Sequence, residues 1–139
     1  MKERSALMEN SIDPRLILMS AWAAMLCLYL YCDFFTLFRP GQLEVMSGGK
    51  MGPFAVSQAG LFWAGVLMAI PSLMILVSTL APAGVNRILN MVSGAVYFVV
   101  NIGNLIGETW AYYYLFGLLE VGLAILIFFI ALRRFRPAP

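Results

Sequence analysis

The sequence predicts an all-α protein that crosses a membrane as a bundle of four helices. Of its 139 residues, 62% are hydrophobic and only 12% are charged, and the mean hydropathy is +0.87. A water-soluble domain has about 25% charged residues, so much of the surface chemistry of such a domain is absent. The charges are clustered and leave long apolar runs of the length that spans a bilayer. We therefore expect a single membrane domain over residues 1–139, with the lipid bilayer as its partner.

Four apolar runs, each of the roughly 20 residues that a helix needs to cross the hydrocarbon core, follow one another along the chain. Pro14 suits the entry of the first, and Arg39-Pro40-Gly41 stops it. The second ends before Pro82, the third is the shortest, and the fourth ends at a pair of arginines. The first run is too long for a signal-peptide core and no A-x-A cleavage site closes it, so we expect it to remain. The predicted spans are residues 16–38, 56–80, 87–107 and 110–132, with an outer loop at 39–55.

The distribution of Lys and Arg predicts which side of the membrane each end occupies. The N-terminal segment, the loop between the second and third spans, and the C-terminal tail carry most of them, against two in the outer loop. Positive residues favour the cytoplasmic side, so both termini are expected there, N-in and C-in. The residues counted are Lys2, Arg4, Arg15, Arg87, Arg133, Arg134 and Arg136 on one side, and Arg39 and Lys50 on the other.

Several classes of function are excluded by composition. The net charge of +2 is small and no basic stripe is interleaved with aromatics, so we expect no nucleic-acid partner. There is no His, which excludes histidine catalysis and histidine metal ligation. Cys27 and Cys32 are five residues apart, about 140° around an ideal helix, and cannot form a C-x-x-C redox pair. We expect neither a metal site nor a cofactor.

Polar residues recur on one face of three of the four spans. Lipid cannot satisfy amides or carboxylates, so these faces are expected to point into the bundle. In the third span the spacing is 4, 3, 4, 3 and 4 residues, which follows one side of a helix. The members are Asn90, Gly94, Tyr97, Asn101, Asn104 and Glu108 in the third span, Trp22, Tyr29, Asp33 and Thr36 in the first, and Tyr113 and Glu120 in the fourth.

Together these faces predict a polar cavity that opens to the outer side. No Lys, Arg or His lies within a span beside the acids, and only Arg39 could reach Asp33 or Glu108. Unpaired carboxyls in a low dielectric favour the neutral form, or they bind a proton or a cationic ligand with cation–π help from tyrosines. The alternative is that these groups hydrogen-bond one another and only hold the bundle together. The expected positions are Asp33 and Glu108 at the mouth, Asn101 and Asn104 on the wall, Glu120 on the floor, and Tyr29, Tyr97 and Tyr113 along the lining.

Three local features leave alternatives open. Pro71 removes one backbone hydrogen bond inside the second span and frees the carbonyl of Leu67, either as a tolerated kink or as a hinge. The outer loop, with a short helix expected around residues 42–46, is either a lid or a passive surface loop. Small residues four apart, such as Gly60 and Ala64, permit close helix contact within the bundle or between chains, as in a homo-oligomer.

Several short motifs follow one another along the chain. They are Tyr29-Leu30-Tyr31-Cys32-Asp33-Phe34-Phe35, Pro40-Gly41, Ile70-Pro71, Asn86-Arg87, and Tyr113-Tyr114-Leu115-Phe116 followed by Glu120. In this order they resemble a bacterial family of small four-helix membrane proteins that are described as DoxX-like and carry a domain of unknown function. The resemblance covers nearly the whole chain, and it implies a four-helix bundle in a bacterial inner membrane and no assigned activity.

The sequence favours a membrane protein that binds or transports a small lipophilic or cationic molecule in the acidic, aromatic pocket. A second hypothesis is an enzyme that performs acid–base chemistry on a lipophilic substrate, with Asp33 and Glu120 as paired acids. A third is an accessory or structural subunit of a larger membrane complex.

Overall fold

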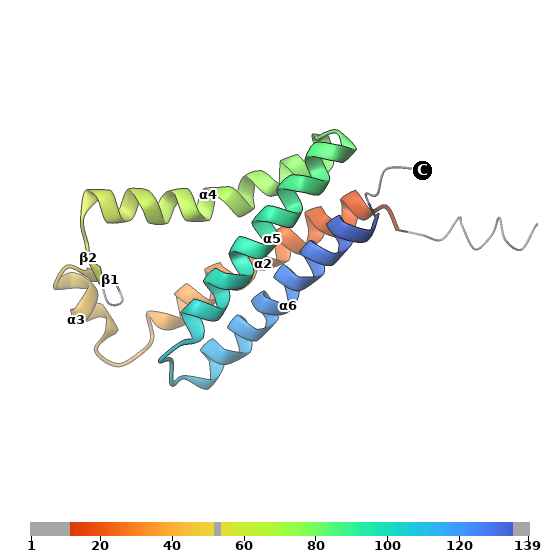
Figure 1. Cartoon of the computed structure of the whole chain (residues 1–139). Coiled ribbons are helices and arrows are strands. Elements are labelled where there is room, and N and C mark those ends of the chain that lie inside the picture. Colours follow the sequence, from red (N-terminus) through yellow and green to blue (C-terminus); the bar gives the residue numbers. More distant parts are fainter. Residues whose placement is uncertain (1–11, 52–53, 135–139) are drawn as a thin grey trace, which may run out of the picture.

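Four long helices form the body of the protein (Figure 1). The computed structural model describes residues 12–51 and 54–134. The long helices are α2 (Pro14–Thr36), α4 (Gln58–Leu80), α5 (Ala83–Leu105) and α6 (Ala111–Arg134), and all four are long and apolar enough to cross a membrane. The predicted all-α, four-helix bundle is thereby confirmed. Which side each end occupies stays a prediction, and Lys2, Arg4 and Arg136 lie outside the described residues.

Local sequence explains where the helices begin. Pro14 stands in the first turn of α2, and the Asp13 carboxylate accepts a hydrogen bond from the Arg15 N–H at 2.8 Å. Ser57 caps α4 in the same way by accepting from the Gly60 N–H at 3.0 Å. The third span begins at Ala83, earlier than the predicted Arg87, because Pro82 occupies the N-cap and its missing N–H costs nothing there.

The core lies where α2 meets the other three helices. α2 packs on α4 and α6, while α5 packs along α6 and on a shorter part of α4. Leu18, Trp22 and Met25 of α2 are fully buried, together with Tyr97 of α5 and Ile127 of α6. The Trp22 and Tyr97 rings meet edge to face with their centroids 5.6 Å apart, so two large aromatics fix the centre of the bundle.

Helix α4 joins the bundle only along its C-terminal half. Its buried residues are Pro71, Met74 and Ser78, and toward its N-terminal end the helix leans away from the other three (Figure 1). The carbonyl of Leu67, which Pro71 leaves without its helical partner, accepts a hydrogen bond from the Tyr97 hydroxyl. The expected free carbonyl is thus used to attach α4 to α5 near the point where α4 departs.

A small folded segment separates the end of α2 from the start of α4. It contains α3 (Gln42–Ser47), close to the short helix that the sequence predicts, and a strand pair formed by β1 (Lys50–Met51) and β2 (Phe54–Ala55). Backbone hydrogen bonds tie it together, among them Val56 N–H to Gly49 O at 2.8 Å. We refer to α3, β1, β2 and residues 58–68 of α4 as the arm. Several of its apolar side chains are exposed, including Leu43, Phe54 and Phe62.

Candidate functional site

A buried hydrogen-bond network joins three helices at the end of the bundle where α4 meets α5. Its centre is Asn90, whose side-chain oxygen accepts from Trp22 Nε1 at 2.7 Å and from Ser78 Oγ at 3.2 Å. The Asn90 amide nitrogen donates to the backbone oxygen of Asn86 at 2.9 Å and to its side-chain oxygen at 2.8 Å. Asn86 in turn donates to the Ser78 carbonyl at 2.6 Å. All hydrogen-bonding positions of the Asn90 side chain are used, so Asn90 has no group free for a ligand. The network therefore serves to hold the three helices together.

Asn86 and Ser78 are missed as core polar residues by the sequence reasoning. Both are fully buried, although each lies near a helix end where polar residues usually face the membrane surface. The available signal is spacing. Asn86 precedes Asn90 by one helical turn and so extends the predicted polar face of α5.

The predicted floor residue, Glu120, lies inside the bundle beside Asn101. Glu120 is 4% exposed and Asn101 is fully buried. Gly94 of α5 packs against residues 124–128 of α6, and Leu105 packs against Gly117; counting along both helices from these contacts places Asn101 level with Glu120. Within the described part of the chain, Glu120 Oε1 and Asn101 Nδ2 are both buried without a hydrogen-bond partner.

Tyrosines and a second acid surround this pair. The Tyr29 hydroxyl donates to Asn101 Oδ1 at 2.6 Å, which leaves the amide nitrogen of Asn101 as its free end. Tyr113 precedes Glu120 by seven residues, about two turns of α6, and Asp33 follows Tyr29 by four residues, about one turn of α2, so each pair shares one side of its helix. Tyr29 is buried and Tyr113 half-buried, whereas Asp33 is exposed.

An arginine closes the same end of the bundle. Arg39 donates through its terminal nitrogen to Glu108 Oε2 at 2.9 Å and through Nε to the Tyr112 hydroxyl at 2.6 Å. Its guanidinium carbon also lies 5.4, 5.1 and 5.2 Å from the ring centroids of Trp110, Tyr112 and Tyr113. Of the two acids that the sequence offers to Arg39, the structure selects Glu108. We call Arg39, Glu108, Trp110, Tyr112 and Tyr113 the Arg39 cluster.

Glu108 lies between α5 and α6 and also caps α6. Its Oε1 accepts from the backbone N–H groups of Thr109 at 2.7 Å and Trp110 at 3.1 Å. Burial alone would raise the pKa of this carboxyl, but the Thr109 N–H, the Arg39 guanidinium and the Trp110 N–H together hold the pKa below its usual value of 4.5. Glu108 therefore stays ionised at neutral pH.

The prediction that the whole polar face of α5 points into the bundle is wrong for Asn104. Asn90, Gly94, Tyr97 and Asn101 are buried as expected, but Asn104 is exposed. Asn104 follows Asn86 by eighteen residues, or five full helical turns, so the two share one side of α5. Asn86 is covered by α4, to which it donates, whereas α4 has already left the bundle at the level of Asn104.

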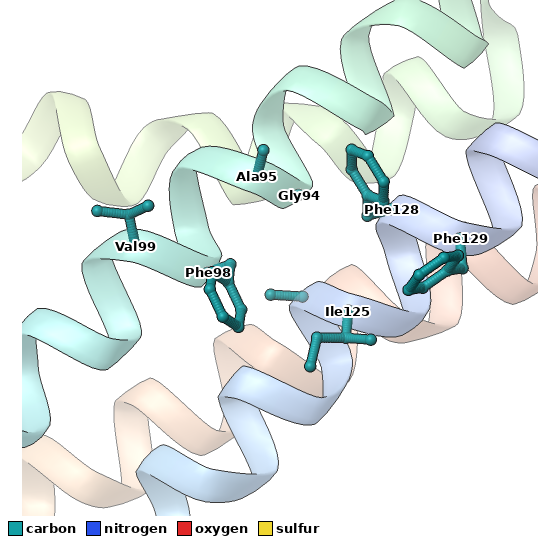
Figure 2. Close-up of a pocket in the computed structure, with 8 residues that line it drawn as sticks. Gly94, Ala95, Phe98, Val99, Ile125, Phe128 and Phe129 are labelled. Atoms are coloured by element: carbon teal, nitrogen blue, oxygen red, sulfur yellow. The ribbon is translucent and has the colours of Figure 1, made fainter.

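One hollow described in the structure is apolar and lies apart from the acids. It is an open groove of about 340 Å³ between α5 and α6 (Figure 2). Gly94, which allows α5 and α6 to approach closely, is one of the residues that line it. No predicted site residue lines it. Its walls are Gly94, Ala95, Phe98, Val99, Ala124, Ile125, Phe128 and Phe129.

Within residues 12–51 and 54–134, no three Cys, Asp or Glu side chains form a group that could hold a metal ion. Cys27 and Cys32 are free thiols, one exposed and one buried.

Comparison with known proteins identifies a family but no activity. A family model described as a family of unknown function, DUF6326, matches residues 7–136, nearly the whole chain. The chain belongs to the DUF6326 family. The match does not link DUF6326 to DoxX-like proteins or to bacteria, so that resemblance stays a prediction. Neither curated proteins nor solved structures give a match to this DUF6326 chain.

Proposed function

We propose that the protein binds a small lipophilic cation, or a proton in its place, at the Glu120 carboxyl inside the membrane. The observation that carries the proposal is the environment of Glu120. Its side chain is 4% exposed and its Oε1 has no hydrogen-bond partner among the described residues. A buried carboxylate without a partner is strongly unfavourable, so the site is suited to a group that supplies a positive charge or a proton.

Residues 12–51 and 54–134 supply no such group near Glu120. The basic residues of the four long helices stand at their ends, and Arg39 is engaged with Glu108. Asp33 is a second acid on the side of α2 that carries Tyr29, and in its ionised form it favours a cation further. The rings of Tyr29 and Tyr113 supply aromatic faces of the kind that bind quaternary and delocalised cations.

Asn101 gives the site a polar contact besides charge. Its oxygen is occupied by Tyr29, and its Nδ2 has no partner within the described residues. A donor that is buried in this way is costly unless a ligand, or water that accompanies the ligand, accepts from it. A cation that also carries an acceptor group would satisfy Glu120 and Asn101 together.

The expected location of this activity is a bacterial inner membrane with both termini in the cytoplasm. The bias of Lys and Arg toward one side and the DoxX-like resemblance support this placement. In that orientation the Arg39 cluster and Asp33 belong to the outer side, and the ligand reaches Glu120 from there.

The test is equilibrium binding of radiolabelled tetraphenylphosphonium to the purified protein in lipid nanodiscs. Wild-type protein should bind the probe saturably, and Glu120→Gln should lose most of the binding while it remains folded. Glu44→Gln is the matched control, because Glu44 is an exposed carboxylate on α3, and it should bind as wild type does. Equal binding by Glu120→Gln, or no saturable binding by wild type, would refute the proposal.

Acid–base catalysis on a lipophilic substrate is the alternative that a specific observation favours. Asp33 and Glu120 interact electrostatically, yet Asp33 is exposed and Glu120 is buried. Two nearby acids in unlike environments suit the roles of general base and general acid. Chemical conversion of a bound ligand, lost in both Asp33→Asn and Glu120→Gln, would favour this alternative over simple binding.

A further inference from the structure

Both halves of one helix–helix interface are left unpaired within this chain. The first half is the packing face of α4. Pro71, Met74 and Ser78 form its buried part. Counting toward the N-terminus at helical spacing, the same face continues through Leu67, Ala64 and Gly60.

Gly60 precedes Ser78 by eighteen residues, or five full turns, and so stands on the same side of α4. Gly60, Ala64 and Leu67 are partly exposed, whereas Ser78 is fully buried. Small residues at four-residue spacing allow a neighbouring helix to approach closely. Leu67 packs against the core of its own bundle, whereas at Gly60 and Ala64 the arm carries a packing face that the bundle does not cover.

The second half is the uncovered side of α2 and α5. Arg15 of α2 donates to the Thr79 carbonyl of α4 at 2.8 Å, which identifies the side of α2 that faces α4. Asp33 follows Arg15 by eighteen residues and lies on that same side. Asn104 stands in the same relation to Asn86, and both Asp33 and Asn104 are exposed.

The two halves match in their distance from one shared bond, which Asn86 makes to Ser78. Because α4 and α5 run in opposite directions, Gly60 and Asn104 each lie eighteen residues, about 27 Å at 1.5 Å per residue, along their own helices from this bond. Gln58, a polar residue at the start of α4, would then stand close to Asp33 and Asn104, where an amide can hydrogen-bond both.

We propose that two copies of this chain exchange arms, so that α4 of each copy covers the exposed side of α2 and α5 in the other. The exchange makes a closed two-fold dimer, since each copy gives and receives the same interface. It keeps every contact of the bundle, including the bond from Tyr97 to Leu67.

The folded arm favours a second copy over closure of α4 onto its own bundle. The segment between α2 and α4 has its own folded structure, formed by α3, the strand pair and the Val56–Gly49 bond. We call this segment the spacer. This spacer stands between the end of α2 and the start of α4 (Figure 1). The exposed Leu43 and Phe54 of the spacer also gain a surface to pack on in the exchanged dimer.

Disulfide trapping between differently tagged copies tests the exchange. In a background with Cys27→Ala and Cys32→Ala, one copy carries Gly60→Cys and the other Asn104→Cys, co-expressed and oxidised in native membranes. A Cβ at Gly60 would lie 3.1 Å from the Ser57 hydroxyl and 3.8 Å from the Ala55 carbonyl oxygen, so the Ser57 side chain must shift by a few tenths of an ångström to accept the substitution. The expected result is a covalent dimer that carries both tags.

The matched control replaces Gly60→Cys by Phe62→Cys. Phe62 is exposed and points to nearly the opposite side of α4, so it should not link to Asn104→Cys. Absence of the mixed dimer would overturn the proposal, and an internal disulfide in a chain with both Gly60→Cys and Asn104→Cys would show closure within one copy instead. The mass of the untouched wild-type protein in nanodiscs gives a second readout: a dimer supports the exchange and a monomer contradicts it.

Discussion

Replacement of Asn90 by Leu should destabilise the protein far more than the same replacement of Asn104. Asn90 takes part in four hydrogen bonds, two accepted from Trp22 and Ser78 and two donated to Asn86. Hydrogen bonds between membrane helices average about 0.6 kcal/mol each, so losing the two that join α5 to Trp22 of α2 and Ser78 of α4 removes about 1.2 kcal/mol. The polar groups left behind without partners raise the total to about 3–4 kcal/mol, since each buried orphan costs about 1–3 kcal/mol before relaxation.

Asn104→Leu is the matched control. It changes the same residue type on the same helix, but Asn104 is exposed, so the monomer should change by less than about 0.5 kcal/mol. The assay is reversible unfolding in mixed detergent micelles, dilute enough to keep the protein monomeric, followed by circular dichroism. Equal unfolding free energies for the two variants would refute the assignment of Asn90 as the centre of a structural network.

Three further predictions concern packing and the Arg39 cluster. A double-mutant cycle with Arg39→Met and Glu108→Gln should give a coupling energy of about 1–2 kcal/mol. This exceeds the roughly 0.2–1 kcal/mol typical of exposed pairs, because the two side chains are only 17% and 12% exposed. Additive effects of the two substitutions would contradict a formed ion pair. Because the pKa of Glu108 in the folded protein lies below 4.5, its stabilising contribution should be complete above pH 4.5 and be lost as the pH falls below that value. The difference in unfolding free energy between wild type and Glu108→Gln should therefore shrink in acid. A difference that stays constant with pH would count against the lowered pKa. Gly94→Ala should lower the free energy of unfolding by about 1–3 kcal/mol, since its Cβ would lie 3.2–3.3 Å from backbone atoms of α6. Gly122→Ala is the control, because its Cβ would enter open space, and it should be neutral or stabilising. Equal losses for the two variants would argue against close packing at Gly94.

The spans and the buried face of α5 could be predicted because both are local properties of the chain. Apolar runs of this length form helices that are able to cross a membrane, and residues spaced by one turn share a side whatever else the chain does. Asn90, Tyr97 and Asn101 are buried for this reason. The free carbonyl of Leu67 is likewise a local consequence of Pro71, although its partner Tyr97 is thirty residues away and could not be named.

What could not be predicted depends on the path of α4. Helical spacing assigns Asn104 to the same side of α5 as Asn86, but burial also requires a neighbouring helix. α4 covers the N-terminal end of α5, where Asn86 lies, and leans away from its C-terminal end, where Asn104 lies. The choice of Glu108 by Arg39 has a similar origin. It depends on how the turn between α5 and α6 is placed relative to the end of α2, which no spacing in the sequence encodes.

The most direct test of the proposed function is the response of the Glu120 carboxyl to a cation. Solid-state NMR of protein labelled with ¹³C at the Glu carboxyl positions, with Glu120 assigned through its loss in Glu120→Gln, reports on each acid separately. Addition of tetraphenylphosphonium should shift the Glu120 signal and leave that of exposed Glu44 unchanged. A Glu120 signal that does not move when the probe is present at saturating concentration would contradict a cation site at this residue.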